Sequence, residues 1–230
     1  MGSTRLTAAG VRAGDDVVLP SFGGEEAAEA VRGVGARPVF ADIDPLSLCL
    51  DPKSAEAAVT PRTSAIAPVH LFGHPADMVC LLEAGQRLGL PVVEFGGPDV
   101  GSRVTAVDAV RRRQHAAYLD RRLRGVEIPH VAQGVEHAYT DYVVRVPGNG
   151  RPDRDAFKQA LRGRGVRCHV PVKNPAHRLP QFQVDLWLPE TERAVAETLA
   201  LPLWAGMTKR DLHRMVSACN ALGGLLSEPA

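Results

Sequence analysis

Four short apolar runs recur between residues 17 and 93, each bounded by glycine, proline or aspartate. Within each run the side chains are continuously apolar rather than alternating, and many are β-branched or aromatic. This pattern is typical of strands buried on both faces, as in a parallel sheet. The runs cover residues 17–19, 38–41, 65–69 and 91–93. We therefore expect an open sheet of four parallel strands between residues 16 and 95.

Helices are predicted between these runs. Residues 25–31 begin with two glutamates, which the helix dipole favours in a first turn. Asp77 is a suitable N-cap for a helix over residues 77–84 that ends near Gly89. Strand, helix and strand in alternation predict a right-handed α/β layer.

From residue 105 onward helical periodicity dominates. Helices are expected over residues 105–124, 153–163, 190–199 and 209–222, and strands over residues 139–146 and 166–170. This mixed order is typical of an α+β domain rather than of a continued α/β layer. We therefore expect two domains, a first one over residues 1–104 and a second, smaller one over residues 105–230.

Composition and charge exclude several classes of protein. Lysine and arginine number 27 against 26 acidic residues, so the chain lacks the strong basic balance of a nucleic-acid-binding protein. No apolar run is long enough to cross a bilayer, and the first residues contain no apolar signal core. The four cysteines are scattered without paired spacing, which fits reduced thiols. We expect a cytoplasmic protein with neither a membrane nor a nucleic-acid partner.

Candidate acid and base groups follow the predicted strands. His70 comes at the end of the third run, and Glu94 and Asp99 come after the fourth. Because ligands bind outside the carboxyl ends of parallel strands, these side chains are candidates for a shared site, and His169 joins them by residue type. A histidine that titrates near neutrality beside an orienting carboxylate suits proton transfer. Alternatively, His70 is a buried structural histidine whose nitrogens are satisfied by the backbone.

A metal site is a weaker alternative for the same loop. His70 and His74 have the i, i+4 spacing of a zinc-ligating pair. That spacing brings two histidines to one face only in a helix, whereas Gly73 and Pro75 favour a loop. We expect no metal ligand here.

Two series of sequence segments occur in the same order as in a known family. The first half contains GDDVVLPSF, ARPVFADIDP, VTPRTSAIAPVHLFGHPADM and LGLPVVEFGG. The second half contains RRRQHAAYLDRRL, HAYTDYVVRV, RDAFKQALRGRGVRCHVPV and LPETERAVAETLALPLWAGMTKRDLHRM. Both series resemble the DegT/DnrJ/EryC1/StrS sugar aminotransferases. The resemblance implies a truncated aspartate-aminotransferase-like large domain with an open parallel sheet, followed by a small α+β C-terminal domain.

The resemblance also implies a pyridoxal-phosphate enzyme, and this chain departs from that expectation. Members of the family carry a long block between the strand resembling LPVVEFGG and the helix resembling RRRQHAAY, whereas residues 101–105 span that gap here. The missing block holds further strands and the Schiff-base lysine. None of the lysines present falls at that position; they are Lys53, Lys158, Lys173 and Lys209.

The family's carboxylate for the pyridine nitrogen is also replaced. Phe95 stands at that position and cannot hold the ring nitrogen protonated. With the lysine and the carboxylate both absent, we expect no cofactor and no aminotransferase activity from this chain alone.

Three functions remain open. The first is a non-catalytic or accessory subunit, in amino-sugar or natural-product biosynthesis, that pairs with itself or with a full-length relative through the shortened sheet. The second is a repurposed cofactor-free isomerase, dehydratase or cyclase with a nucleotide-sugar or other small-molecule pocket. Its catalytic groups would be His70, Glu94, Asp99 and His169, the last on a small-domain strand that faces the rim of the sheet in the family. The third is a remnant that folds without a specific activity.

Overall fold

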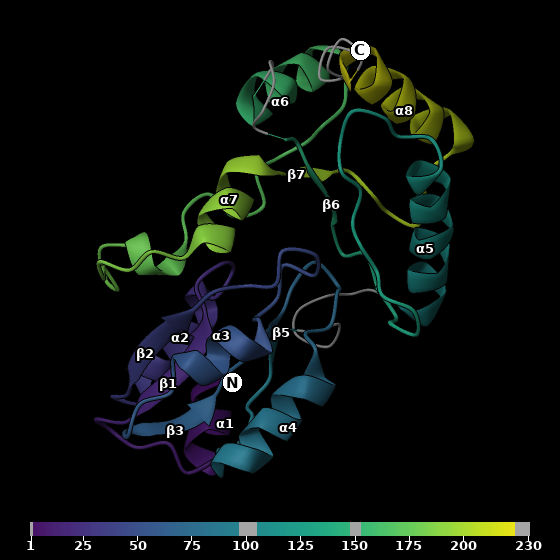
Figure 1. Ribbon diagram of the computed structural model, residues 1–230. Helices are drawn as coiled ribbons and strands as arrows, with labels where there is room; N and C mark the ends of the chain where they lie inside the picture. The colour runs from purple at the N-terminus through teal and green to yellow at the C-terminus, as the bar shows by residue number, and fades with distance from the viewer. Residues whose placement is uncertain (1, 97–104, 148–152, 224–230) are drawn as a thin grey trace. The chain divides into compact units, whose positions relative to one another are not determined.

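The protein is described by a computed structural model, which covers residues 2–96, 105–147 and 153–223. The chain divides into two compact units (Figure 1). The first comprises Met1–Val100 and Asn174–Val195, and the second comprises Gly101–Lys173 and Ala196–Ala230. These units differ from the domains expected from sequence in one respect, because the segment Asn174–Val195 belongs to the first unit. The expected boundary at residue 104 lies outside the described residues.

Three parallel strands form the centre of the first unit. β1 (Asp16–Pro20) lies between β2 (Arg37–Ala41) and β3 (Thr63–Ile66), and both pairings are parallel. All five residues of β1 are buried, which explains why its sequence is continuously apolar after Asp16.

The fourth apolar run extends this parallel order beyond β3. Val92 forms an isolated parallel bridge with Ile66. After this bridge, β4 (Val69–His70) and β5 (Phe95–Gly96) form a two-stranded parallel sheet in which His70 lies opposite Gly96. The four expected runs are thus arranged in parallel, although the last one pairs in two short pieces. This pairing brings the ends of the third and fourth runs side by side.

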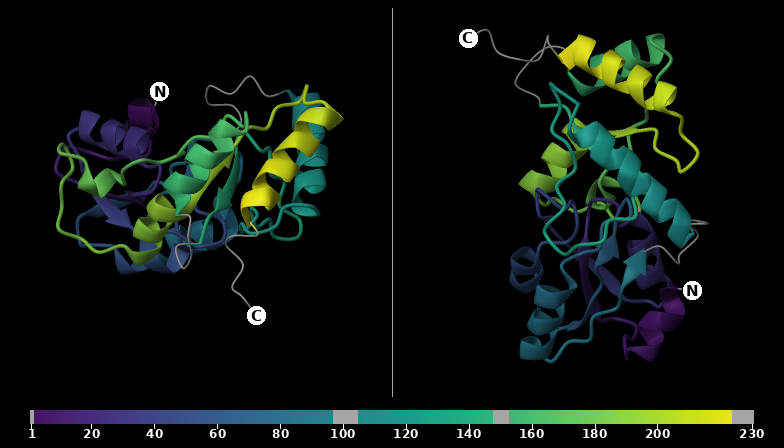
Figure 2. Two further views of the ribbon diagram at one scale, coloured as in Figure 1. Left: turned by 90° about the horizontal axis from the view of Figure 1, so that it is seen from above. Right: turned by 90° about the vertical axis from the view of Figure 1, so that its right-hand side faces the viewer.

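Four helices accompany these strands. The expected helices are α2 (Glu25–Gly33) and α4 (Met78–Leu88); Asp77 caps α4, and Gly89 ends it in the left-handed conformation. Two further short helices, α1 (Gly2–Ala8) and α3 (Pro52–Ala57), have too few residues to produce a periodic pattern. The helices α1 and α2 lie side by side (Figure 2).

The segment Asn174–Val195 completes the first unit through hydrogen bonds to the ends of β1 and β2. It contains the short 3₁₀-helix η1 (Ala176–Arg178) and the start of α7 (Pro189–Glu197). The Asp42 carboxylate accepts hydrogen bonds from the backbone N of Glu190 at 3.0 Å and from the backbone N and hydroxyl of Thr191, each at 2.8 Å. A residue after β2 therefore accepts hydrogen bonds from backbone donors that have no partner within α7, because they lie at its start.

The second unit is a small α+β arrangement. β6 (Tyr142–Arg145) pairs antiparallel with β7 (Thr198–Leu201). Around this pair lie α5 (Ala106–Asp120), α6 (Arg154–Gly163) and α8 (Lys209–Gly223), with α5 and α8 side by side (Figure 2). Together with the parallel first unit, this arrangement confirms the expected fold class.

Two expected elements of the second unit were wrong. Residues 166–170 contain only an isolated antiparallel bridge, between His169 and Ala200, instead of a strand. The helix expected over residues 190–199 ends earlier, at Glu197, and Thr198–Leu201 forms β7. All four residues of β7 are buried, so pairing with β6 and burial outweigh the local helical pattern.

Candidate functional site

The ends of β4 and β5 bring His70 and Glu94 into contact. The Nε2 atom of His70 lies 2.9 Å from Oε2 of Glu94. His70 is the last residue of β4, and Glu94 immediately precedes β5, so the parallel pairing of the two strands sets this distance. These are two of the four side chains that the sequence nominated for acid–base chemistry.

The second ring nitrogen of His70 is also engaged. Its Nδ1 accepts a hydrogen bond of 2.9 Å from the backbone N of Ala76. A neutral imidazole that accepts at Nδ1 carries its proton on Nε2, so His70 donates toward the Glu94 carboxylate. The His70 side chain is only 11% exposed whereas that of Glu94 is 54% exposed. Glu94 is therefore the member of the pair that a solute would meet.

Gly96 permits this close approach of the two strands. Its φ is +70°, and a Cβ at this position would lie 2.5 Å from the carbonyl oxygen of His70. No side chain fits there without moving β4. The helix α1 also contacts this site, because the guanidinium of Arg5 donates a hydrogen bond of 3.2 Å to the carbonyl oxygen of Glu94.

The other two nominated residues are Asp99 and His169. Asp99 is outside the described residues. His169 belongs to the second unit, where its Nε2 lies 3.9 Å from Oδ1 of Asp141, with both side chains exposed to solvent. A shared role of His70 and His169 therefore stays a prediction.

A second histidine, His177, occupies the interior of the first unit. Its Nδ1 lies 2.7 Å from the hydroxyl of Ser21, which follows β1, and its backbone N donates to the same hydroxyl at 3.0 Å. The hydroxyl oxygen accepts the backbone bond, and with the ring proton on Nε2 the hydroxyl donates to Nδ1. The Nε2 atom lies 3.3 Å from Oε1 of Glu192, within ion-pair distance but without the geometry of a hydrogen bond.

The order serine, histidine, carboxylate resembles a nucleophilic triad, but burial excludes that role here. Ser21 and His177 are both 0% exposed, so no substrate reaches the hydroxyl in this arrangement. Loss of hydration lowers the pKa of His177, with a smaller lowering by Arg178 and a partial compensation by Glu192. We interpret the group as a structural connection, which holds the segment Asn174–Val195 in the first unit. Nothing in the sequence around His177 signals it, because Ser21 is 156 positions away.

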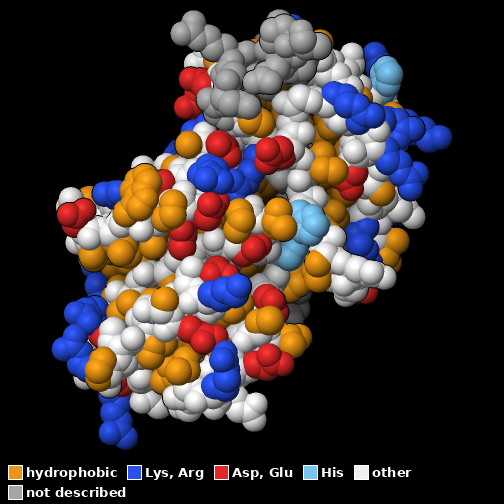
Figure 3. Space-filling model, in the orientation of Figure 1, with side chains coloured by type: hydrophobic (Ala, Val, Ile, Leu, Met, Phe, Trp, Pro, Cys, Tyr) orange, Lys and Arg blue, Asp and Glu red, His pale blue; other side chains and the backbone are white. Residues whose placement is uncertain are grey.

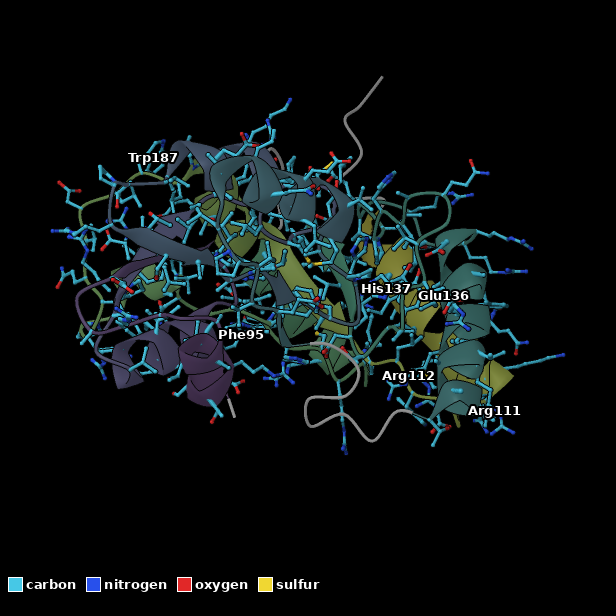
Figure 4. All side chains as sticks on the ribbon, turned by 90° about the horizontal axis from the view of Figure 1, so that it is seen from below. Phe95, Arg111, Arg112, Glu136, His137 and Trp187 are labelled. Carbon is cyan, nitrogen blue, oxygen red and sulfur yellow. The ribbon has the colours of Figure 1, made fainter. Side chains whose placement is uncertain are left out.

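Phe95 stands where the resemblance places the carboxylate for the pyridine nitrogen of pyridoxal phosphate. Phe95 is 7% exposed, and its ring packs against the start of α1, where a Cβ on Gly2 would lie 2.6 Å from Cε1. Figure 4 shows Phe95 beside this helix. An apolar ring at this position offers no carboxylate for a protonated pyridine nitrogen.

The four lysines are distributed over both units. Lys53 is the lysine of the first unit, and it is exposed on α3. Lys158, Lys173 and Lys209 belong to the second unit, and Lys158 is bound to Asp155 at 2.7 Å.

Within residues 2–96, 105–147 and 153–223, no three or more His, Cys, Asp or Glu side chains are grouped so that they could hold a metal ion. None of the helices in that part of the chain is both long and apolar enough to cross a membrane.

Comparison with protein families gives a match over nearly the whole chain. The model of the DegT/DnrJ/EryC1/StrS aminotransferase family matches residues 3–105 and 103–220 as two separate stretches. The two stretches meet at residues 103–105, where the sequence indicated a missing block.

Individual proteins are also similar to this chain. The L-glutamine:2-deoxy-scyllo-inosose aminotransferase of Streptomyces lividus is 40% identical over 148 residues, which cover 59% of this chain and 34% of that protein. The chain thus spans about a third of that relative. A pleiotropic regulatory protein of Geobacillus stearothermophilus is 28% identical over 299 residues, covering 92% of this chain and 79% of that protein. This stretch is longer than the 230 residues of the chain, so the relative contains residues that the chain lacks.

Solved structures share the fold. An aminotransferase TlmJ from Streptoalloteichus hindustanus matches with a TM-score of 0.85 and 24% identity, over 98% of this chain and 84% of that one. The S. venezuelae DesV structure with a ketimine intermediate matches with a TM-score of 0.84 and 24% identity, over 96% of this chain and 82% of that one. At this level of identity the likeness concerns the fold.

Proposed function

Because the chain belongs to the DegT/DnrJ/EryC1/StrS aminotransferase family, we propose that it is a pyridoxal-phosphate-independent member of it, acting as a non-catalytic or accessory subunit. The Streptomyces lividus relative and the TlmJ structure are named as aminotransferases, so the support for this role comes from the chain's own residues. The observation that carries it is Phe95, which packs against Gly2 where the family places a carboxylate. Phe95 cannot stabilise a protonated pyridine nitrogen, and none of the four lysines falls at the family's Schiff-base position.

The shortened sheet supports a role in an assembly. β5 lies at the edge of its two-stranded sheet, with β4 as its neighbour. An edge strand presents unpaired backbone groups to other chains, so pairing with a second chain would satisfy them. We propose a dimer on this basis, either of two copies or of one copy with a full-length relative, in the cytoplasm and without nucleic acid. Amino-sugar or natural-product biosynthesis is the pathway class that the names of the relatives favour.

Copurification and native mass spectrometry test the subunit proposal. The chain is expressed with a full-length family member from the same genome, and the masses of the intact complexes are measured. We expect a complex of one chain with one relative, or a homodimer. Detection of only monomers at micromolar concentration, with or without the relative, would overturn the proposal.

Borohydride reduction tests the loss of the coenzyme site. The purified chain is incubated with pyridoxal phosphate, reduced and mapped by peptide mass spectrometry, with the full-length relative as the positive control. We expect no stoichiometric adduct on Lys53, Lys158, Lys173 or Lys209. A full adduct at one of them would show that the chain holds the coenzyme, against the proposal.

The contact between His70 and Glu94 favours a second candidate, a cofactor-free isomerase, dehydratase or cyclase acting on a keto-sugar or similar small molecule. Glu94 is the exposed group, so its carboxylate would accept a proton from the carbon next to a carbonyl. The Nε2–H of His70 would orient that carboxylate, since Nδ1 is held by Ala76. Substitutions of His70 and Glu94 distinguish the two candidates, because they should abolish a catalytic activity only if the protein is the cofactor-free enzyme.

A further inference from the structure

The second unit contains a cavity of about 400 Å³ that neither function above uses. Trp204 and Met207 contribute to its wall from the loop after β7, and Arg167 contributes from the segment after α6. The remaining side of the cavity is formed by α8. Its Asp211, Arg214 and Met215 lie on one face of that helix because they are spaced three and four residues apart.

One part of the cavity wall is apolar and includes a flat aromatic surface. Met207 and Met215 are 8% and 2% exposed, whereas the Trp204 ring beside them is 47% exposed. The indole lies along the backbone of Gly206, where a Cβ would be 3.6 Å from Cδ1. The carbonyl oxygen of Trp204 is also 3.1 Å from Nδ1 of His115 on α5. An indole that is held in place and exposed beside a cavity suits stacking against a planar ring.

The charged part of the wall has an excess of cations. Among the described residues, Arg167 and Arg214 form no hydrogen bond or ion pair, and Arg214 interacts electrostatically with the Asp211 carboxylate. The carboxylate on this wall, Asp211, accepts hydrogen bonds from the hydroxyl of Thr208 at 2.6 Å and from its backbone N at 3.0 Å, which cap α8. Figure 3 shows further Lys and Arg side chains gathered over α8 and the adjoining end of α5. The cavity wall therefore carries two guanidinium groups and one carboxylate, with an excess of positive charge.

We propose that this cavity binds a planar aromatic molecule that carries a carboxylate or a phosphate. The ring would lie against Trp204 and the two methionines, and the anionic group would meet Arg167 and Arg214. Guanidinium groups bind carboxylates and phosphates alike through paired N–H donors. The two arginines therefore suit either anionic group. A volume of about 400 Å³ lies within the range of small-molecule pockets, roughly 300–1,000 Å³.

Nitrogen-15 NMR of the two indole N–H groups tests this site directly. The chain has two tryptophans, Trp187 in the first unit and Trp204 at the cavity, and the Trp187→Phe variant assigns their signals. The labelled protein is titrated with naphthoate, with naphthyl phosphate, with uncharged naphthalenemethanol and with inorganic phosphate. We expect the Trp204 signal to move to saturation with one or both anionic aromatics, while the Trp187 signal stays in place. If naphthoate binds more tightly than naphthyl phosphate, the preferred anionic group is a carboxylate; if naphthyl phosphate binds more tightly, it is a phosphate.

Substitutions then test the role of charge. Arg167→Ala and Arg214→Ala should each weaken binding of the anionic probe about tenfold, because each removes a charge-assisted hydrogen bond. Arg210→Ala is the matched control, since Arg210 is exposed on the same helix but is not on the cavity wall. All three side chains are exposed, so the variants should fold.

Several results would overturn the proposal. The first is absence of a saturable shift of the Trp204 signal with either anionic aromatic at millimolar concentration. Equal affinity for naphthalenemethanol and naphthoate would show that the arginines do not contribute. Saturation by inorganic phosphate alone, with the affinity of naphthyl phosphate, would show that the ring does not contribute. Parallel shifts of both tryptophan signals would indicate nonspecific association.

Discussion

The hydroxyl of Ser21 lies 2.7 Å from Nδ1 of His177, and this contact joins the end of β1 to a segment 156 positions later in the chain. The same segment is held a second time by Asp42, which follows β2 and caps α7. Two neighbouring parallel strands are thus each followed by one polar side chain that binds the segment Asn174–Val195. The four residues that make these contacts are all buried, so loss of either contact should cost much of the stability of this unit; they are Ser21, His177, Asp42 and Thr191.

Replacement of His177 should destabilise the first unit strongly. His177→Ala removes a fully buried ring and leaves the Ser21 hydroxyl without its acceptor, so we expect a loss of about 2–4 kcal/mol in the free energy of unfolding. His213→Ala is the control, because His213 is exposed on α8 and should change stability by less than about 0.5 kcal/mol. Urea denaturation measures both. A loss below about 1 kcal/mol for His177→Ala would contradict the structural role.

His177 should also make stability depend on pH. Burial lowers the pKa of His177 below its ordinary value of 6.5, so the unfolded chain binds more protons than the folded one as pH falls. The stabilisation by the neutral ring is therefore complete above about pH 7 and decreases as pH falls below 6.5 toward the folded-state pKa. His177→Asn, which cannot titrate, should show a shallower loss of stability between about pH 7 and pH 5. Identical slopes in denaturation curves of the two proteins would contradict this account.

Removal of the Asp42 carboxylate should release the start of α7. Asp42→Ala leaves three donors on Glu190 and Thr191 without their acceptor, and we expect a loss of about 1–2 kcal/mol, the range of an N-cap. The control is Asp51→Ala, which removes the cap of α3 from a neighbouring position in the sequence. Limited proteolysis should cut between residues 174 and 195 faster in Asp42→Ala than in Asp51→Ala. Equal rates in this segment would show that Asp42 does not hold it.

Elements with local signals could be predicted from the sequence. Asp77, Thr105 and Asp153 each accept a hydrogen bond from a backbone N three residues later, and α4, α5 and α6 begin there. These caps depend only on sequence neighbours, so their position is visible in the sequence. The strand β7 has no such signal. Its side chains follow directly from a helical pattern, and only pairing with β6 determines that the helix ends at Glu197.

The same distinction applies to the candidate site. The contact of His70 with Glu94 could be expected, because the carboxyl ends of parallel strands meet at one edge. The segment containing His177 was assigned to the second domain because it follows that domain's residues in sequence. Its position in the first unit depends on contacts with Ser21 and Asp42, which are distant in sequence and have no local pattern.

Gly96 should not tolerate a side chain. Gly96→Ala would place a methyl group 2.5 Å from the carbonyl oxygen of His70 and would also force alanine into a φ of +70°. Gly89→Ala is the matched control, with a φ of +67° and no atom within 4 Å of the added Cβ. We expect both variants to lose about 1 kcal/mol to backbone strain and Gly96→Ala to lose at least about 1 kcal/mol more. Equal losses on thermal denaturation would show that β4 and β5 are not in close contact.

Substitution of His70 and Glu94 distinguishes the accessory-subunit proposal from the repurposed-enzyme candidate. A catalytic Glu94 would remove a proton next to a carbonyl, so the wild type should exchange that proton of a nucleotide-linked keto-sugar with deuterium oxide, as followed by proton NMR. Glu94→Gln should then abolish exchange while changing the melting temperature by only about 3 °C, because the side chain is 54% exposed. Glu29→Gln, another exposed glutamate, serves as the control and should exchange at the wild-type rate. His70→Ala should also lose exchange, but a fall in stability is expected as well, since the ring binds Ala76. If the wild type catalyses no exchange, or if Glu94→Gln retains it, the repurposed-enzyme candidate fails and the accessory-subunit proposal stands alone.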